Sequence, residues 1–278
     1  MAGVPSQAGT TGGRSVSGLE YDPAHTAAYY DRYAGQEEER WRKNQRARFE
    51  HQAYVGHVSR RVSRGDRVLD AGCGPGTFAR VALEQGARVT CQDISSVQLE
   101  SCRSRVPDAE DHVLGSIVDL GDFHTDSFDV TLALGGPVSY CLDRAGDAVR
   151  ELKRVTRPGG WVGLSVMSLF GTVHRFLPGI LPLSVEVNEG ILRTGDLPRT
   201  VNDGHECHLY RVEELRSLLA TAGLRDIELF ASGWLVPNGE FELPEEGSRA
   251  WSMLLEADLR ASSESPGAGT HIIAWAKA

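Results

Sequence analysis

Apolar segments typical of strands alternate with segments of helical periodicity along most of this 278-residue chain. Seven segments are predicted strands: residues 67–70, 88–93, 112–117, 128–134, 161–167, 227–230 and 271–275. Helices are predicted between them at 77–85, from a capping box at 95–98, around 149–155 and at 212–222. Such alternation favours a mostly parallel sheet covered on both faces. We therefore predict a doubly wound, seven-stranded α/β fold.

Three further regions do not follow this alternation. Residues 1–20 hold glycine, serine and threonine and are predicted to be a flexible tail. Residues 21–64 are predicted to form a helical lid, with helices at 24–34 and 37–61, before a main domain at 65–278. Insertions at 168–209 and 234–269 follow strands, and ligands of open α/β sheets bind beyond the carboxyl ends of strands. We expect the insertions to cover a binding site.

Composition narrows the class of protein. A net charge of −9 argues against a protein that coats nucleic acid, because phosphate binding depends on Lys and Arg. The sequence has no apolar run of the ~18 residues that span a bilayer, and no signal-peptide pattern at its start. The five cysteines form no C-x-x-C pair, and His205-x-x-His208 lacks a third ligand. We expect a cytoplasmic monomer or homodimer that binds no membrane, nucleic acid or metal.

A glycine-rich turn after the first strand carries the strongest functional signal. Gly72, Gly74 and Gly76 occupy alternate positions directly after Asp70 and Ala71. Glycines let a ligand approach the backbone without meeting a Cβ atom. A dinucleotide site requires G-x-G-x-x-G spacing, which is absent here, and the Asp70 carboxylate would repel a pyrophosphate. The same carboxylate favours a cationic ligand that carries an amine.

With its acidic residue followed by G-x-G-x-G, the chain resembles the class I S-adenosylmethionine-dependent methyltransferases. The resemblance extends from Tyr29 to Gly233. It includes the acidic end of the second strand at Asp93, which follows Gly72 by 21 residues, close to the ~20 of a ribose-binding carboxylate. It also includes Phe128–Gly136 and the helix and turn at 151–160. The resemblance implies a Rossmann-like fold, methyl transfer and S-adenosylmethionine as the cofactor.

The resemblance also implies the donor-binding residues. Backbone at Ala71, Gly72 and Gly74 would approach the methionine moiety, and Asp93, next to Ile94, would hold the ribose hydroxyls. Ser116 stands where the family usually has an adenine-side Asp. Ser116 and Ile117 would flank the adenine, and the Leu134 carbonyl would face the donor's amino group.

Aromatic and basic residues of the predicted lid complete the candidate site. Tyr29 and Arg48 are candidates to cover and clamp the donor, because rings contact cations and guanidinium binds carboxylates. Tyr30, His51 and His208 are candidate catalytic residues, since phenol and imidazole can position or remove a proton. Packing or surface roles are the alternatives for all of them. Residues predicted either to line the acceptor pocket or to form loop surface are Trp234, Asn238, Glu240 and Glu242.

Our hypothesis is a methyltransferase that acts on a small molecule by in-line transfer. The aromatic lid favours a nitrogen or nucleophilic ring carbon on an aromatic or amine-bearing specialised metabolite as the acceptor. Two alternatives stay open at this point. The fold can be repurposed for cyclisation or another non-methyl reaction, or the chain can be a non-catalytic donor-binding module.

Overall fold

The computed structural model describes most of the chain apart from the first sixteen residues and several short gaps. The described residues are 17–36, 44–176, 179, 182–201, 203–233, 235 and 242–278. Most of the predicted tail therefore lies outside the described residues. Within the described part, no helix is long and apolar enough to cross a membrane.

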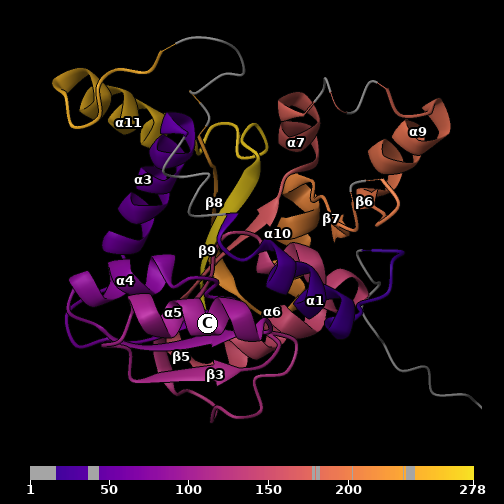
Figure 1. Cartoon of the computed structure of the whole chain (residues 1–278). Helices are drawn as coiled ribbons and strands as arrows, with labels where there is room; N and C mark the ends of the chain where they lie inside the picture. Colours follow the sequence, from indigo (N-terminus) through magenta and orange to yellow (C-terminus); the bar gives the residue numbers. More distant parts are fainter. Residues whose placement is uncertain are drawn as a thin grey trace, which may run out of the picture.

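A seven-stranded sheet forms the centre of the protein (Figure 1), and its strand order is β3-β2-β1-β4-β5-β9-β8. Its strands are β1 (Arg67–Ala71), β2 (Arg88–Asp93), β3 (Asp111–Leu114), β4 (Phe128–Ala133), β5 (Thr156–Met167), β8 (Arg225–Ala231) and β9 (His271–Lys277). Strands β1 to β5 run parallel, and β9 runs antiparallel to both of its neighbours. This arrangement confirms the predicted doubly wound, mostly parallel fold.

Helices cover both faces of the sheet. One face carries α3 (Gln45–Ser59), α4 (Thr77–Glu84) and α5 (Ser96–Arg105). The other carries η1 (Pro137–Arg144), α6 (Ala145–Val155) and α10 (Val212–Thr221). Each face buries its own cluster of apolar side chains, so the sheet is the shared wall of two cores.

Local capping signals set several helix ends as the sequence predicts. Ser95 precedes α5 and accepts a hydrogen bond from the Gln98 amide at 3.1 Å, as an N-cap does. Gly86 and Gly223 follow α4 and α10 with φ of +83°, a conformation that glycine adopts without strain. Helix α3 begins at Gln45, where Asn44 caps it and accepts from the Ala47 amide at 3.2 Å, and residues 37–43 of the predicted helix lie outside the described residues.

The N-terminal helices and the two insertions, which do not follow the alternation of strands and helices, form the part of the protein beyond the strand ends. The first insertion contains α7 (Leu169–Arg175), α9 (Val185–Thr194) and the short pair β6 (Asp196–Leu197) and β7 (Cys207–His208). The second contains α11 (Arg249–Ala261), which packs on α3 through Phe49 and Trp251, with ring centroids 5.2 Å apart. In Figure 1, α11 and α3 stand on one side of this region and α7 and α9 on the other, while α1 (Pro23–Tyr33) lies below α9.

Candidate functional site

A cavity of about 730 Å³ lies at the carboxyl ends of the parallel strands. Its walls come from the loops after β1, β2, β3 and β4 and from η1, α1, α3, α7 and α9. These elements place the cavity where ligands of open α/β sheets bind. Its volume is within the roughly 300–1,000 Å³ of small-molecule sites.

The glycine-rich turn forms one end of the cavity. The Gly72 and Cys73 amides both donate to the Gln92 carbonyl, at 2.7 and 3.0 Å, so the turn is fixed against β2. Gly72 has φ of +75°, and a Cβ atom there would lie 2.6 Å from the Pro137 side chain. Gly72 and Gly74 both line the cavity. The backbone conformation at position 72 thus requires glycine, and the absence of a side chain there also leaves room for a ligand to approach.

Asp93 joins this turn to the end of β2. Its Oδ2 accepts a hydrogen bond from the Gly74 amide and its Oδ1 from the Ser95 amide, both at 2.8 Å. The side chain is nearly buried yet lines the cavity, as does Ile94. An ionised carboxylate has about four lone-pair sites, so each oxygen can accept a further bond from a ligand hydroxyl.

Asp70 and Ala71 are fully buried and lie behind the cavity wall. The Asp70 Oδ2 accepts from the Ala79 amide at 2.9 Å, in the first turn of α4. Gly76 is the N-cap of α4 and has no side chain to make that bond. Burial raises the pKa of Asp70 to about 8. In this structure Asp70 therefore caps α4 from β1, and direct contact with a cationic ligand stays a prediction.

A tyrosine that precedes α1 reaches the predicted adenine side of the cavity. The hydroxyl groups of Tyr21 and Ser116 lie 2.6 Å apart and share a hydrogen bond. Burial raises the pKa of Tyr21 to about 12, so it stays a neutral phenol. Both residues line the cavity together with Ile117 and Leu134.

Aromatic side chains of α1, η1 and the loop before β7 form a continuous wall. The Tyr140 hydroxyl lies 2.9 Å from His205 Nε2, which gives a phenol–imidazole hydrogen bond. Tyr29 stacks on the His205 ring at 5.2 Å, and Tyr30 packs edge-on against Tyr140 at the same centroid distance. Burial lowers the pKa of His205 to about 4, so its imidazole is neutral at neutral pH.

A second imidazole lines the cavity from α3. His51 packs near Phe78, with ring centroids 6.0 Å apart. Burial, aided by the charge of Arg80, lowers the pKa of His51 to about 4. The histidine predicted from the lid is thus on the cavity wall and uncharged.

Two further predicted site residues, like Asp70 and Ala71, lie outside the cavity lining. His208 is fully buried, with Nδ1 2.7 Å from Asp196 and Nε2 3.0 Å from Glu214. Burial opposes protonation, but these two hydrogen bonds outweigh it and raise the pKa of His208. The Arg48 Nε atom donates to Glu246 at 2.9 Å on the surface. These contacts tie β7 to β6 and α10, and α3 to the segment before α11.

The loop after β8 contributes little to the described site. Glu242 is exposed and lies outside the cavity lining, and Trp234, Asn238 and Glu240 lie outside the described residues.

Apolar side chains of the first insertion form the end of the cavity opposite Asp93. They come from α7, the segment before α9, α9 itself and the strands that follow it: Val173, Phe176, Leu183, Ile191, Leu197, Val201 and Leu209. Charged and strongly polar ligand groups lose hydration against such walls without compensation. Thr172 and Arg175 of α7 also line the cavity, so this end fits a largely apolar ligand with some polar groups.

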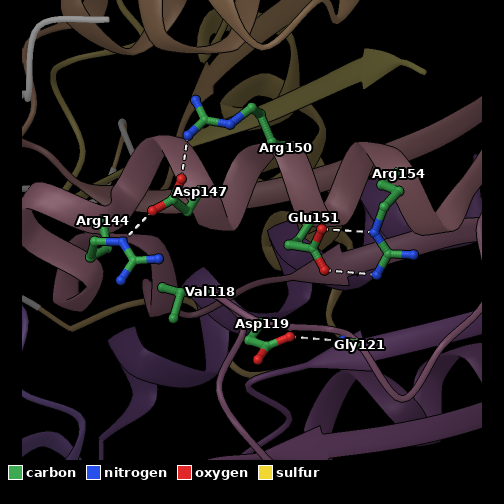
Figure 2. A pocket seen from close by; sticks show the side chains of 8 residues that line it. All are labelled: Val118, Asp119, Gly121, Arg144, Asp147, Arg150, Glu151 and Arg154. Carbon is green, nitrogen blue, oxygen red and sulfur yellow. Dashed lines mark hydrogen bonds and ion pairs between the residues drawn. The ribbon is translucent and has the colours of Figure 1, made fainter. Parts of the chain in front are cut away.

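A second, shallower depression of about 420 Å³ lies along α6 (Figure 2). Its arginines pair with carboxylates of the same helix: Arg144 and Arg150 with Asp147, and Arg154 with Glu151 at 2.7 Å. The loop residue Asp119 faces them and accepts from the Gly121 amide (Figure 2). Because opposite charges balance across it, this surface has no strong preference for an anion or a cation.

Comparisons with known proteins identify the family. A family model described as a methyltransferase domain matches residues 69–164. The ubiquinone biosynthesis O-methyltransferase of Thiobacillus denitrificans is 32% identical over 168 residues, which cover 59% of this chain and 67% of that protein. The chain belongs to the class I S-adenosylmethionine-dependent methyltransferases. This membership confirms the predicted family and S-adenosylmethionine as its cofactor.

Other matches of this methyltransferase are shorter or show the fold alone. The malonyl-[acyl-carrier protein] O-methyltransferase of Serratia marcescens is 40% identical over 106 residues, which cover 37% of this chain. The chain thus spans about two fifths of that relative's length, 39%. The structure of the [4+2]-cyclase SpnF shares the fold, with a TM-score of 0.60 at 17% identity over 95% of this chain and 98% of that one.

The donor end of the cavity fits S-adenosylmethionine on its own geometry. The turn leaves backbone exposed at Gly72 and Gly74, and the Asp93 carboxylate faces the same space. The family model covers this end, whereas α1, α3, α7 and α9 of the methyltransferase lie outside the matched residues.

Sequence reasoning did not select three residues that line the cavity: His205, which it weighed only as half of a metal-binding pair, and Tyr21 and Tyr140. Tyr21 precedes a predicted helix and Tyr140 follows the Gly135–Gly136 pair. Neither position has a periodic pattern or motif that points to a ligand.

Proposed function

We propose that this chain transfers a methyl group from S-adenosylmethionine to a neutral nucleophile on a largely apolar small molecule. One observation carries the proposal: a single cavity has the family's donor-binding residues at one end and the apolar side chains of α7 and α9 at the other. Because the two ends share one space, both substrates can meet in it.

The donor-side assignments follow the cavity lining. The backbone at Gly72 and Gly74 would lie along the methionine part, and Asp93 would accept hydrogen bonds from the ribose hydroxyls. Ser116, held by Tyr21, and Ile117 would flank the adenine. When bound, S-adenosylmethionine supplies an activated methyl group on a sulfonium, so the protein mainly has to orient the acceptor and exclude water.

The acceptor's proton requires a base that is neutral before the reaction. His205 and His51 both have a pKa lowered to about 4 and line the cavity. His205 is the stronger candidate because its hydrogen bond with Tyr140 orients the ring. Tyr30 packs on Tyr140 and supports that orientation. In this proposal His205 takes the acceptor's proton as the methyl group is transferred.

The apolar end also bears on the acceptor class. A protonated alkylamine would lose far more hydration free energy against these walls than a neutral ring or hydroxyl compound. Our hypothesis is therefore a neutral aromatic or heteroaromatic specialised metabolite, methylated at nitrogen or a nucleophilic ring carbon. Oxygen is the alternative acceptor atom, because the relatives compared above are named as O-methyltransferases.

Product analysis tests this proposal. The protein is incubated with methyl-deuterated S-adenosylmethionine and panels of neutral heteroaromatics, phenols and alkylamines, and mass spectrometry follows both the methylated product and S-adenosylhomocysteine. We expect transfer to a neutral apolar acceptor, with kcat at least tenfold lower in His205→Gln and unchanged in Arg48→Ala. Turnover of alkylamines alone, or product without S-adenosylhomocysteine, would contradict the proposal and favour a different acceptor or a repurposed fold.

A further inference from the structure

A carboxyl group, a thiol and an imidazole lie in one row across neighbouring strands, on the face of the sheet that α4 and α5 cover. Asp70 of β1 is the register partner of Cys91 of β2, and Cys91 is the register partner of His112 of β3. Side chains of register partners in adjacent strands point to the same face of a sheet. The row therefore faces one interior space directly behind the glycine-rich turn.

Two more cysteines enter this space from other elements. Cys73 comes from the turn itself and Cys102 from α5, and a Cβ atom at Gly76 would lie 2.8 Å from the Cys102 sulfur. The ligand atoms of Cys73, Cys91 and Cys102 all lie within 4.8 Å of one another. All three residues are buried, with at most 4% exposed.

His112 lies at the edge of this three-cysteine cluster and is the candidate for a fourth donor. His112 lies within hydrogen-bonding reach of Cys102. Its Nε2 is buried and has no hydrogen-bond partner in the described part of the chain. This nitrogen is therefore available as a ligand next to Cys102, the member of the cluster that His112 approaches.

We propose that Cys73, Cys91, Cys102 and His112 form a binding site for a thiophilic divalent cation, with Zn²⁺ as the ion of best fit. Three thiolates and one imidazole are an established tetrahedral zinc ligand set. Zn–S bonds of about 2.3 Å place tetrahedral sulfurs about 3.8 Å apart, so the sulfurs move by about 1 Å or less. Each coordinating thiol releases its proton to solvent as its bond to the metal forms.

The other two cysteines show how an isolated buried thiol behaves in this protein. Cys141 donates to the Pro137 carbonyl at 3.5 Å, and the Cys207 sulfur contacts the Met167 sulfur at 3.6 Å. Each fills a small gap in an apolar region. Cys73 likewise donates to the Gly74 carbonyl at 3.5 Å, so what distinguishes the three clustered thiols is that they converge from a turn, a strand and a helix.

An ion can reach the proposed site from the donor cavity, and its binding would affect the donor turn. Cys73 lines the donor cavity, so an ion can reach the cluster from that side. A metal bound there would fix the turn between Gly72 and Gly74 to β2 and α5. We therefore expect bound metal to raise the melting temperature and to protect the three thiols.

Cobalt substitution tests the site without any activity measurement. Reduced, metal-free protein is titrated with Co²⁺ under anaerobic conditions and then with Zn²⁺. We expect one Co²⁺ per chain, with thiolate-to-cobalt charge-transfer absorption that Zn²⁺ abolishes. Cys102→Ser should reduce affinity at least 100-fold and His112→Gln at least tenfold, while the control Cys141→Ser should bind as wild type does.

A wild-type measurement keeps the test valid if a cysteine variant fails to fold. Alkylation is mapped by mass spectrometry with and without Zn²⁺. We expect the ion to slow the labelling of Cys73, Cys91 and Cys102 at least tenfold and to leave Cys141 and Cys207 unchanged. Uniform protection of all five thiols, or no Co²⁺ charge-transfer band at one equivalent, would overturn the proposal. Unchanged affinity in His112→Gln would overturn the four-ligand assignment.

Discussion

Replacing Asp93 with asparagine tests the donor site most directly. In the structure each Asp93 oxygen accepts a backbone amide at 2.8 Å, from Gly74 and from Ser95. The amide group of Asn would set a donor against one of these N–H groups, at a cost of about 1–3 kcal/mol of folding free energy. One charge-assisted bond to a ribose hydroxyl would also be lost, about 1.5–3 kcal/mol. Donor Kd should then rise by roughly 10- to 150-fold.

Asp129→Asn is the matched control for this experiment. Asp129 also accepts a backbone amide at 2.8 Å, from Arg67, but at the amino end of β4, away from the cavity. Isothermal titration with S-adenosylhomocysteine measures Kd, and circular dichroism confirms that both variants are folded. Asp129→Asn should lower stability and leave Kd within twofold. Our reasoning would be refuted by an Asp93→Asn Kd within threefold of wild type, or by an equal loss in the control.

Three further predictions test other contacts. Gly72→Ala places an alanine at a positive φ and brings its Cβ atom into contact with Pro137. Calorimetry should therefore show a melting temperature at least roughly 4 °C lower than that of the wild type. An unchanged melting temperature would contradict the steric argument. Tyr21→Phe and Ser116→Ala should each cost about 0.5–1.5 kcal/mol in denaturant unfolding. The double variant should cost no more than Ser116→Ala, which also loses the bond from the Val118 amide; additive costs would show that the Tyr21–Ser116 hydrogen bond is unimportant. Burial lowers the pKa of His57 in the folded protein to about 3. As pH falls, the unfolded chain therefore binds a proton at this histidine before the folded chain does, and the stability of the folded state decreases below about pH 6.5. Between pH 7 and 4.5, His57→Leu should lose about 2–3 kcal/mol less stability than wild type in urea titrations; an equal loss would contradict the assigned pKa.

The sheet and the donor end were predictable because their signals are local. Each strand is a short apolar run next to a turn or cap, and Gly86 ends its helix through a conformation that the sequence indicates. Asp93 ends a strand and follows Gly72 at the spacing of a ribose-binding carboxylate. Such features depend on neighbours along the chain, so a single sequence contains them.

The acceptor end depends on contacts between distant segments, which the sequence does not display. His208 has the sequence context of a helix start, yet Asp196 and Glu214 enclose its ring. Tyr140 gains its role only because the loop before β7 brings His205 within 2.9 Å. The cysteines that converge behind the donor turn likewise have no spacing motif in the sequence, because they come from different elements of the fold.

Because the two ends of the cavity come from different elements, donor affinity and acceptor selectivity should be separable. Val173 of α7 lines the acceptor end and packs with Ile191 and Leu209, apart from the strand ends that hold Asp93. A single methylene in an apolar pocket changes discrimination by roughly 10- to 200-fold. Val173→Phe should therefore raise the acceptor KM at least tenfold and leave donor Kd within twofold. His174→Phe, on the same helix but outside the lining, should change neither. A parallel change of donor Kd and acceptor KM in Val173→Phe would show that the two ends act as one unit.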